Sequence, residues 1–130
     1  LNIYEVVEQG KDVAIIALGN FFQLGKQVHN LLKNQGINAT LINPRYITGI
    51  DKQLLDTLCL DHKLVVTLED GVLDGGFGEK IARYYGTKNM KTLCYGAEKQ
   101  FVDRYKPKDF LAANRLIDTM IAEDIAKQIN

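Results

Sequence analysis

The feature that most constrains the fold of this chain is a pair of nearly uninterrupted apolar runs, Val13–Leu18 and Leu64–Leu68. Both runs contain β-branched residues, and both are far shorter than the roughly 20 residues that a membrane-spanning helix needs. A strand that is apolar at successive positions, instead of alternate ones, is typical of a parallel sheet with helices on both faces. The two runs therefore predict central strands of an α/β domain.

Segments of strand type alternate with segments of helix type along the 130 residues. The predicted strands are Tyr4–Gly10, Val13–Leu18, Ile37–Asn43, His62–Asp70 and Met90–Gly96. The predicted helices are Phe21–Gln35, a segment that starts near Asp51, a segment from about Gly76 to Tyr85, and Phe110–Asn130. This alternation predicts one domain over residues 1–130, a three-layer αβα sandwich around a mostly parallel five-stranded sheet with right-handed crossovers.

Short local signals indicate where the helices begin and end. Gly19-Asn20 follows an apolar run and predicts a sharp corner between strand and helix. Gly36 stands where the glycine of a helix C-terminus belongs, and Asp51 is placed to cap the N-terminus of the next helix. The buried face of the last helix is predicted from the spacing of Ile117, Ile121, Ile125 and Ile129.

Charge and cysteine content narrow the classes of protein further. Sixteen basic and sixteen acidic residues cancel, which leaves no electrostatic footprint for nucleic acid or an anionic membrane. Cys59 and Cys94 lie far apart with no CxxC pairing, which predicts reduced, buried thiols and a cytoplasmic location. The chain starts at Leu1 and its only methionines are Met90 and Met120, so we expect a fragment of a longer polypeptide.

A glycine-rich and acidic segment, LEDGVLDGGFGEK, occupies Leu68–Lys80. Its glycines match neither the dinucleotide fingerprint G-x-G-x-x-G nor the phosphate loop that continues into Gly-Lys-Ser/Thr. Its four carboxylates would repel a phosphate, and their spacing lacks the signature of a calcium loop. We therefore expect neither a phosphate nor a metal here, and we expect surface carboxylates to cap the N-terminus of the following helix.

The glycines then require a packing role, because glycine adopts positive φ and lets another backbone approach closely. We interpret the segment as turn geometry or as a contact with polypeptide, either another domain or another subunit. The residues assigned to this interface are Arg45, Glu69, Asp70, Gly71, Gly75, Gly76, Phe77 and Gly78.

Other chemistry-bearing residues form no recognisable catalytic set. Arg45 follows the end of a strand, where its guanidinium suits a carboxylate or phosphate, but an ion pair with Glu69 or Asp70 is the favoured interpretation. His29 is expected to be exposed or half-buried, and His62 can pair with the adjacent Asp61. From these residues alone we predict no catalytic, cofactor-binding or metal-binding residue.

Three blocks in this order, VAIIALGN, NATLINPRYITGID and HKLVVTLEDGVLDGGFGEKIA, resemble the C-terminal domain of the transketolase-like thiamine diphosphate enzymes. The resemblance runs from about Lys11 to Tyr95, and within it the pattern is most similar to the 1-deoxy-D-xylulose-5-phosphate synthase family. The chain departs from that family at Asn43, where aspartate is usual, and at Gly49, where proline is common. The C-terminal domain of transketolase or of a 2-oxoacid dehydrogenase β subunit is the nearest alternative.

The resemblance carries functional implications. It implies a parent enzyme that condenses pyruvate with glyceraldehyde 3-phosphate, releases CO2, and supplies isoprenoid, thiamine and pyridoxal synthesis. It also implies that thiamine diphosphate and magnesium are held by upstream domains, so that this domain is inactive alone and supports those domains and a homodimer. We expect no nucleic-acid or membrane partner. A stand-alone nucleotide- or anion-binding α/β module is the alternative from another class.

Overall fold

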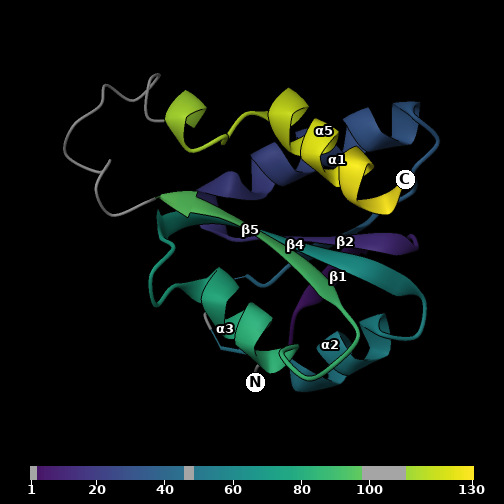
Figure 1. Cartoon of the computed structure of the whole chain (residues 1–130), viewed down its shortest axis with the longest axis vertical. Coiled ribbons are helices and arrows are strands. Elements are labelled where there is room, and N and C mark those ends of the chain that lie inside the picture. The colour runs from purple at the N-terminus through teal and green to yellow at the C-terminus, as the bar shows by residue number, and fades with distance from the viewer. Residues whose placement is uncertain (1–2, 46–48, 98–110) are drawn as a thin grey trace.

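The computed structural model describes residues 3–45, 49–97 and 111–130 (Figure 1). The strands are β1 (Glu5–Glu8), β2 (Asp12–Ala17), β3 (Thr40–Asn43), β4 (His62–Val72) and β5 (Lys91–Ala97). The helices are η1 (Gly19–Phe21), α1 (Phe22–Asn34), α2 (Lys52–Leu58), α3 (Phe77–Tyr84) and α5 (Asp118–Ile129). Residues 111–113 are helical as well.

The five strands form one sheet in the order β1-β3-β2-β4-β5. The pairs β2–β3, β2–β4 and β4–β5 are parallel, and only the edge strand β1 runs antiparallel, against β3. The predicted mostly parallel five-stranded sheet is therefore confirmed. The first strand is shorter than its predicted range of Tyr4–Gly10, since it stops at Glu8.

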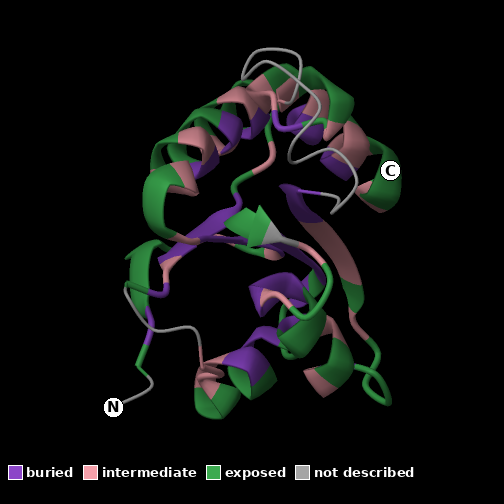
Figure 2. Ribbon diagram, turned by 90° about the vertical axis from the view of Figure 1, so that its left-hand side faces the viewer, coloured by how far each residue is buried: buried purple, intermediate pink, exposed green. Residues whose placement is uncertain are grey.

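Helices cover both faces of the sheet, with α1 and α5 on one face and α2 and α3 on the other (Figure 1). Alternate residues of β4 serve the two layers: Leu64, Val66 and Leu68 pack toward α1 and α5, and Val65 packs toward α2 and α3. Figure 2 shows the buried residues concentrated along the sheet and on the inner sides of the helices. The predicted three-layer sandwich is confirmed, with the uniformly apolar strands at its centre.

Local sequence signals set the ends of α1 as predicted. Gly19 has φ +60° and makes the corner after β2. At the other end, Gly36 has φ +82°, its N–H donates to the Lys33 carbonyl, and the Ile37 N–H donates to the Leu32 carbonyl. These two hydrogen bonds form a Schellman motif, the C-terminal closure that favours glycine.

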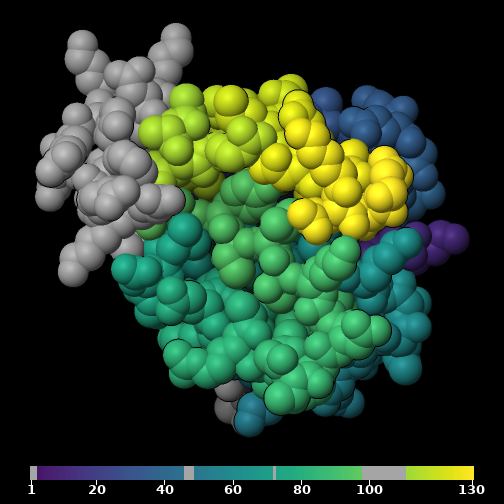
Figure 3. All heavy atoms as spheres, viewed as in Figure 1, coloured from purple at the N-terminus to yellow at the C-terminus, as the bar shows by residue number. Residues whose placement is uncertain are grey.

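The predicted continuous helix over Phe110–Asn130 is wrong in its first part. Phe110 lies outside the described residues, and the helix is interrupted at 114–117, where Arg115 has φ +57°. Tertiary contacts stabilise the break: Arg115 Nη2 and Nε donate to the Asp124 carboxylate at 2.8 and 3.0 Å, and Tyr95 Oη donates to it at 2.7 Å. Figure 3 shows α5 lying over β5 on this face of the molecule, with α3 on the other side of the strand.

Within the described part of the chain, no helix combines the length and the apolar character that crossing a lipid bilayer requires.

Candidate functional site at the carboxyl edge of the sheet

The parallel strands bring three polar segments to one edge of the sheet. Gly19 and Asn20 follow β2, Asn43 ends β3 and is followed by Arg45 two residues later, and the glycine-rich segment spans the end of β4 and the turn into α3. The carboxyl ends of parallel strands are where α/β domains meet ligands and partners. Arg45 and the glycine-rich segment, which the sequence suggested for a site, therefore both lie on this edge.

The carboxylate of Glu69 closes the N-terminus of α3. Glu69 is 3% exposed, and its Oε1 accepts a hydrogen bond from the Phe77 N–H at 3.0 Å while its Oε2 accepts one from the Gly78 N–H at 2.7 Å. Gly76 is the N-cap position but has no side chain to offer, so a residue eight positions upstream of Phe77 satisfies two free N–H groups of the helix. A carboxylate does cap this helix as predicted, but from a buried position instead of the surface.

Burial determines the protonation behaviour of this carboxyl group. Burial raises the pKa of Glu69 above its ordinary value, the N–H groups of Gly78 and Phe77 oppose that rise, and the negative charges of Asp70 and Glu79 add to it. Both oxygens of Glu69 already accept backbone hydrogen bonds. The carboxylate is therefore committed to the fold and is poorly placed to serve a ligand or a partner.

Gly78 allows α3 to touch the sheet directly. A Cβ atom at this position would lie 2.6 Å from Thr67 Oγ1 and 3.0 Å from Cys94 Cβ. The Cys94 thiol donates to the Gly78 carbonyl at 3.4 Å, and burial raises the pKa of this thiol. The close approach expected of the glycines is present here, and it occurs inside the chain.

The remaining predicted interface residues differ in their exposure. Phe77 is 3% exposed and packs with the α2–α3 core, so it is unavailable to a partner in this fold. Asp70, Gly71 and Gly75 are exposed and Gly76 is half-buried. Gly75 has φ +71° and therefore meets the turn requirement that the sequence suggested.

The favoured ion pair of Arg45 with Glu69 or Asp70 is wrong. No ion pair joins Arg45 to either residue: the Glu69 oxygens bind α3, and Asp70 Oδ2 accepts from Asn20 Nδ2 at 3.4 Å. Arg45 is instead exposed, with φ +64°, and lines a pocket of ≈ 360 Å³ together with Gly19, Asn20 and Asn43.

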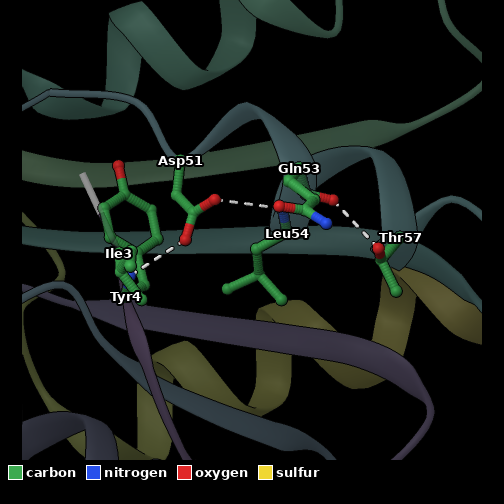
Figure 4. A pocket seen from close by; sticks show the side chains of 6 residues that line it. All are labelled: Ile3, Tyr4, Asp51, Gln53, Leu54 and Thr57. Carbon is green, nitrogen blue, oxygen red and sulfur yellow. Dashed lines mark hydrogen bonds between the residues drawn. The ribbon is translucent and has the colours of Figure 1, made fainter. Parts of the chain in front are cut away.

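A second pocket, of ≈ 270 Å³, lies beside the start of α2 (Figure 4). Asp51 is its organising residue: Oδ1 accepts from the Leu54 N–H at 3.1 Å, which confirms the predicted cap, and Oδ2 accepts from the Tyr4 N–H at 2.9 Å. Burial raises the pKa of the Tyr4 phenol to about 12, and this phenol donates to the Gly49 carbonyl. Both Asp51 oxygens therefore accept backbone hydrogen bonds, and Asp51 links the segment before β1 to the start of α2.

Both histidines take structural positions, and His29 is half-buried as predicted, with its Nε2 2.9 Å from the Ala39 carbonyl oxygen. His62 Nδ1 contacts Asp61 Oδ1 at 2.6 Å, as predicted, and His62 Nε2 lies 2.7 Å from Thr40 Oγ1, which also accepts from the Gly10 N–H. This buried network was not predicted from the sequence, because Thr40 and His62 are 22 residues apart. They lie on β3 and β4, the two strands that flank β2 in the sheet, and only the strand order brings them into contact.

The cysteines are free thiols, as predicted, but neither is fully buried as the prediction had it: Cys59 is exposed and Cys94 is half-buried. Among residues 3–45, 49–97 and 111–130, no group of three or more His, Cys, Asp and Glu side chains is arranged to hold a metal ion. The carboxyl edge thus carries three features: the buried Glu69 carboxylate bound to α3 (the Glu69 clamp), the exposed turn around Gly75 (the glycine turn), and the polar pocket beside Arg45.

Comparison with known proteins gives matches over most of the chain. The family model described as "Transketolase, C-terminal domain" matches residues 4–113. The 1-deoxy-D-xylulose-5-phosphate synthase of Gloeothece citriformis is 32% identical over 95% of this chain and 20% of its own length. That of Crocosphaera subtropica is 33% identical over 93% of this chain and 19% of its own length.

Solved structures agree on the fold. A split-gene transketolase described as an inactive β4 tetramer has a TM-score of 0.85 and 24% identity, over 97% of this chain and 42% of that one. The transketolase of Campylobacter jejuni has a TM-score of 0.66 and 17% identity, over 97% of this chain and 18% of that one. At these identities the likeness concerns the fold alone. The chain spans about a fifth of the length of the curated relatives that it matches.

Proposed function

We propose, since this chain belongs to the transketolase C-terminal domain family, that it is the C-terminal domain of a 1-deoxy-D-xylulose-5-phosphate synthase. The observation that carries the proposal is the agreement between relatives of that name and this chain over nearly its whole length. The parent protein condenses pyruvate with glyceraldehyde 3-phosphate, releases CO2 and works in the cytoplasm. Thiamine diphosphate, with its magnesium ion, supplies the carbanion chemistry when bound.

The described residues of this chain do not fit that cofactor. A diphosphate–magnesium group needs oxygen ligands for the metal and donors for the phosphates, whereas both oxygens of Glu69, the buried acid at the edge, already bind the N–H groups of α3. The exposed acids Asp70, Asp74 and Glu79 would repel a diphosphate. We therefore assign the cofactor and the reaction to upstream domains, and we derive no catalytic step on this chain.

The work of this domain in the proposal is to support those upstream domains and the homodimer. The exposed part of the glycine segment, Asp70, Gly71, Gly75 and Gly76, is the proposed contact with polypeptide. Glu69, Phe77 and Gly78 serve this contact from inside, because their hydrogen bonds and packing hold the turn against α3 and the sheet. Arg45 stands on the same edge, beside β2 and β3.

The proposal is tested on the whole protein encoded by the reading frame that contains this chain. With pyruvate and glyceraldehyde 3-phosphate we expect 1-deoxy-D-xylulose 5-phosphate and CO2, and we expect a version truncated before Leu1 to lose activity. Transfer of ketol groups between sugar phosphates without release of CO2 would instead identify a transketolase. A reading frame that begins at Leu1 would favour the stand-alone module.

The assignment of the cofactor to the upstream domains is tested with the 130-residue chain. We expect it to neither bind thiamine diphosphate nor consume pyruvate, because its edge lacks the required ligands. Titration calorimetry with thiamine diphosphate and magnesium measures this directly, and saturable binding in the micromolar range would overturn the assignment.

A further inference from the structure

The pocket that Gly19, Asn20, Asn43 and Arg45 line, among the described residues, has a volume of ≈ 360 Å³, within the range of sites for small molecules. Its residues follow two adjacent parallel strands, β2 and β3, at their carboxyl ends. The pocket is thus separate from the Glu69 clamp, which lies at the end of β4.

The two asparagine side chains of this pocket each bond a partner that can only donate or only accept, which fixes the positions of the amide oxygen and nitrogen. Asn43 Oδ1 accepts from the Arg45 backbone N–H at 2.7 Å, which leaves Asn43 Nδ2 as a free donor. Asn20 Nδ2 donates to Asp70 Oδ2 at 3.4 Å, which leaves Asn20 Oδ1 as a free acceptor. The two asparagines therefore present one amide donor and one amide acceptor to the pocket.

Arg45 adds a positive charge that no described carboxylate pairs with. Its backbone is held by the Asn43 contact and by the intervening Pro44, which is buried and restricts the chain between them. A guanidinium group binds carboxylates and phosphates through two parallel N–H donors. The pocket thus combines a cation with hydrogen-bonding groups of both polarities. The Asp70 carboxylate lies on the Gly19–Asn20 side of the pocket, so an anionic group is expected on the Arg45 side.

We propose that this pocket binds a small organic anion, a phosphate monoester or a carboxylate, that carries neighbouring hydroxyl groups. The anionic group binds Arg45 and the Asn43 Nδ2 donor, and a hydroxyl group donates to Asn20 Oδ1. No bond is made or broken in this interaction. The inference goes beyond the role assigned to the domain and holds for whichever enzyme the chain belongs to.

The test is a titration of the ¹⁵N-labelled 130-residue chain with glycerol 1-phosphate and, separately, with glycerate, followed by NMR. We expect saturable shifts of the Gly19 backbone amide, both asparagine side-chain amides and Arg45 Nε, with at least one of the two ligands. The ligand that binds more tightly identifies the anionic group. Sodium chloride at equal ionic strength controls for screening, and shifts that chloride reproduces would overturn the proposal.

Arg45→Gln removes the charge and is expected to weaken binding by about tenfold or more, the usual worth of a charge-assisted hydrogen bond. Arg83→Gln is the matched control, because Arg83 is exposed on α3 and does not line the pocket, and its affinity should equal that of the unaltered chain. Equal losses in the two variants would mean that the anion senses only net charge, and would overturn the site.

Asn43→Asp separates binding from loop structure. Aspartate keeps an oxygen for the Arg45 N–H but lacks the Nδ2 donor and adds a negative charge, so anion binding should fall by about tenfold or more with the loop intact. Backbone shifts like those of the unaltered chain, together with lost binding, support the proposal. Unaltered affinity in Asn43→Asp would contradict it.

Discussion

Gly78 is the residue at which the helix layer and the sheet come closest. A methyl group here would overlap Thr67 Oγ1 at 2.6 Å, and the β-branched Thr67 cannot swing away easily because β4 is buried. The glycine-rich pattern predicted such a close approach. Its partners could not be predicted, since Thr67 and Cys94 lie 11 residues before and 16 residues after Gly78, on two different strands.

Gly78→Ala is therefore expected to lower the free energy of unfolding by about 1–3 kcal/mol, the usual cost of overpacking. Gly71→Ala is the matched control in the same segment, because its Cβ would meet only Glu69 Oε1, at an ordinary 3.7 Å. That control should change stability by less than about 0.5 kcal/mol. Urea unfolding of the chain measures both, and equal effects would refute the packing explanation.

Glu69 gives the protein a definite response to pH. Burial raises its pKa in the folded chain above the unfolded value, against the lowering effect of the two N–H groups, so the folded state binds this proton more tightly. The contribution of Glu69 to stability is then largest at low pH, and it decreases as pH rises through the raised pKa.

Glu69→Gln should remove this decrease. The free energy of unfolding of the unaltered chain minus that of the variant should fall as pH rises above the ordinary pKa of a glutamate, when both are measured by urea unfolding. A difference that stays constant or rises with pH would show that the helix N–H groups outweigh burial.

Among the elements, α2 depends most on a single side chain. It has only 7 residues, too few to form a stable helix alone, and Asp51 both caps it and holds the Tyr4 N–H of the edge-strand segment (Figure 4). Asp51→Ala should lower the free energy of unfolding by about 1–2 kcal/mol for the lost cap, with a further cost for the unpaired Tyr4 N–H.

Asp51→Asn is the control for that substitution, because its single oxygen can still cap α2 while the Tyr4 N–H loses its acceptor. We expect a smaller loss of stability than in Asp51→Ala, and amide hydrogen exchange at Leu54 should stay close to that of the unaltered chain. Fast exchange at Leu54 in both variants would contradict the capping role.

The elements also show which signals sequence reasoning can use. Caps and corners at Gly19, Gly36 and Asp51 were predictable because each depends on a residue and its immediate neighbours. The break before α5 was not predictable, because the bonds that stabilise it join Arg115 and Tyr95 to Asp124, which lies beyond the break in the sequence. The pairing of β1 against β3 is likewise a long-range outcome.

In the whole molecule, the alternation of strands and helices was enough to predict both the sandwich and the edge that carries polar groups. The sequence alone could not show which residues of that edge are buried and which are exposed. Glu69, Phe77 and Gly78 turn inward, whereas Asp70, Gly71, Gly75 and Gly76 remain outside. This difference in burial follows from the alternation of side chains along β4 and from the start of α3 at Phe77. Neither feature of the sequence indicates which oxygen of Glu69 binds which N–H group of α3.

Gly76 offers the sharpest test of the proposed contact with polypeptide. Its φ of −81° and ψ of −175° lie in the extended region that any residue adopts, so the backbone at this half-buried position does not itself require glycine. Gly76→Leu should leave the unfolding of the 130-residue chain within about 1 kcal/mol of the unaltered value. In the whole protein, the same leucine side chain would stand in the proposed contact and weaken subunit or domain association.

Asn34→Leu is the matched control, because Asn34 is exposed at the end of α1, a helix that runs back from the carboxyl edge to the start of β3. Sedimentation velocity over a range of protein concentrations should show a weaker dimer for Gly76→Leu and an unaltered dimer for Asn34→Leu. Synthase activity should fall together with association, because the cofactor site is assigned to the domains that this contact supports. If dimer and activity both survive Gly76→Leu, the glycine turn serves only the chain's own fold, and the supporting contact lies elsewhere on the domain.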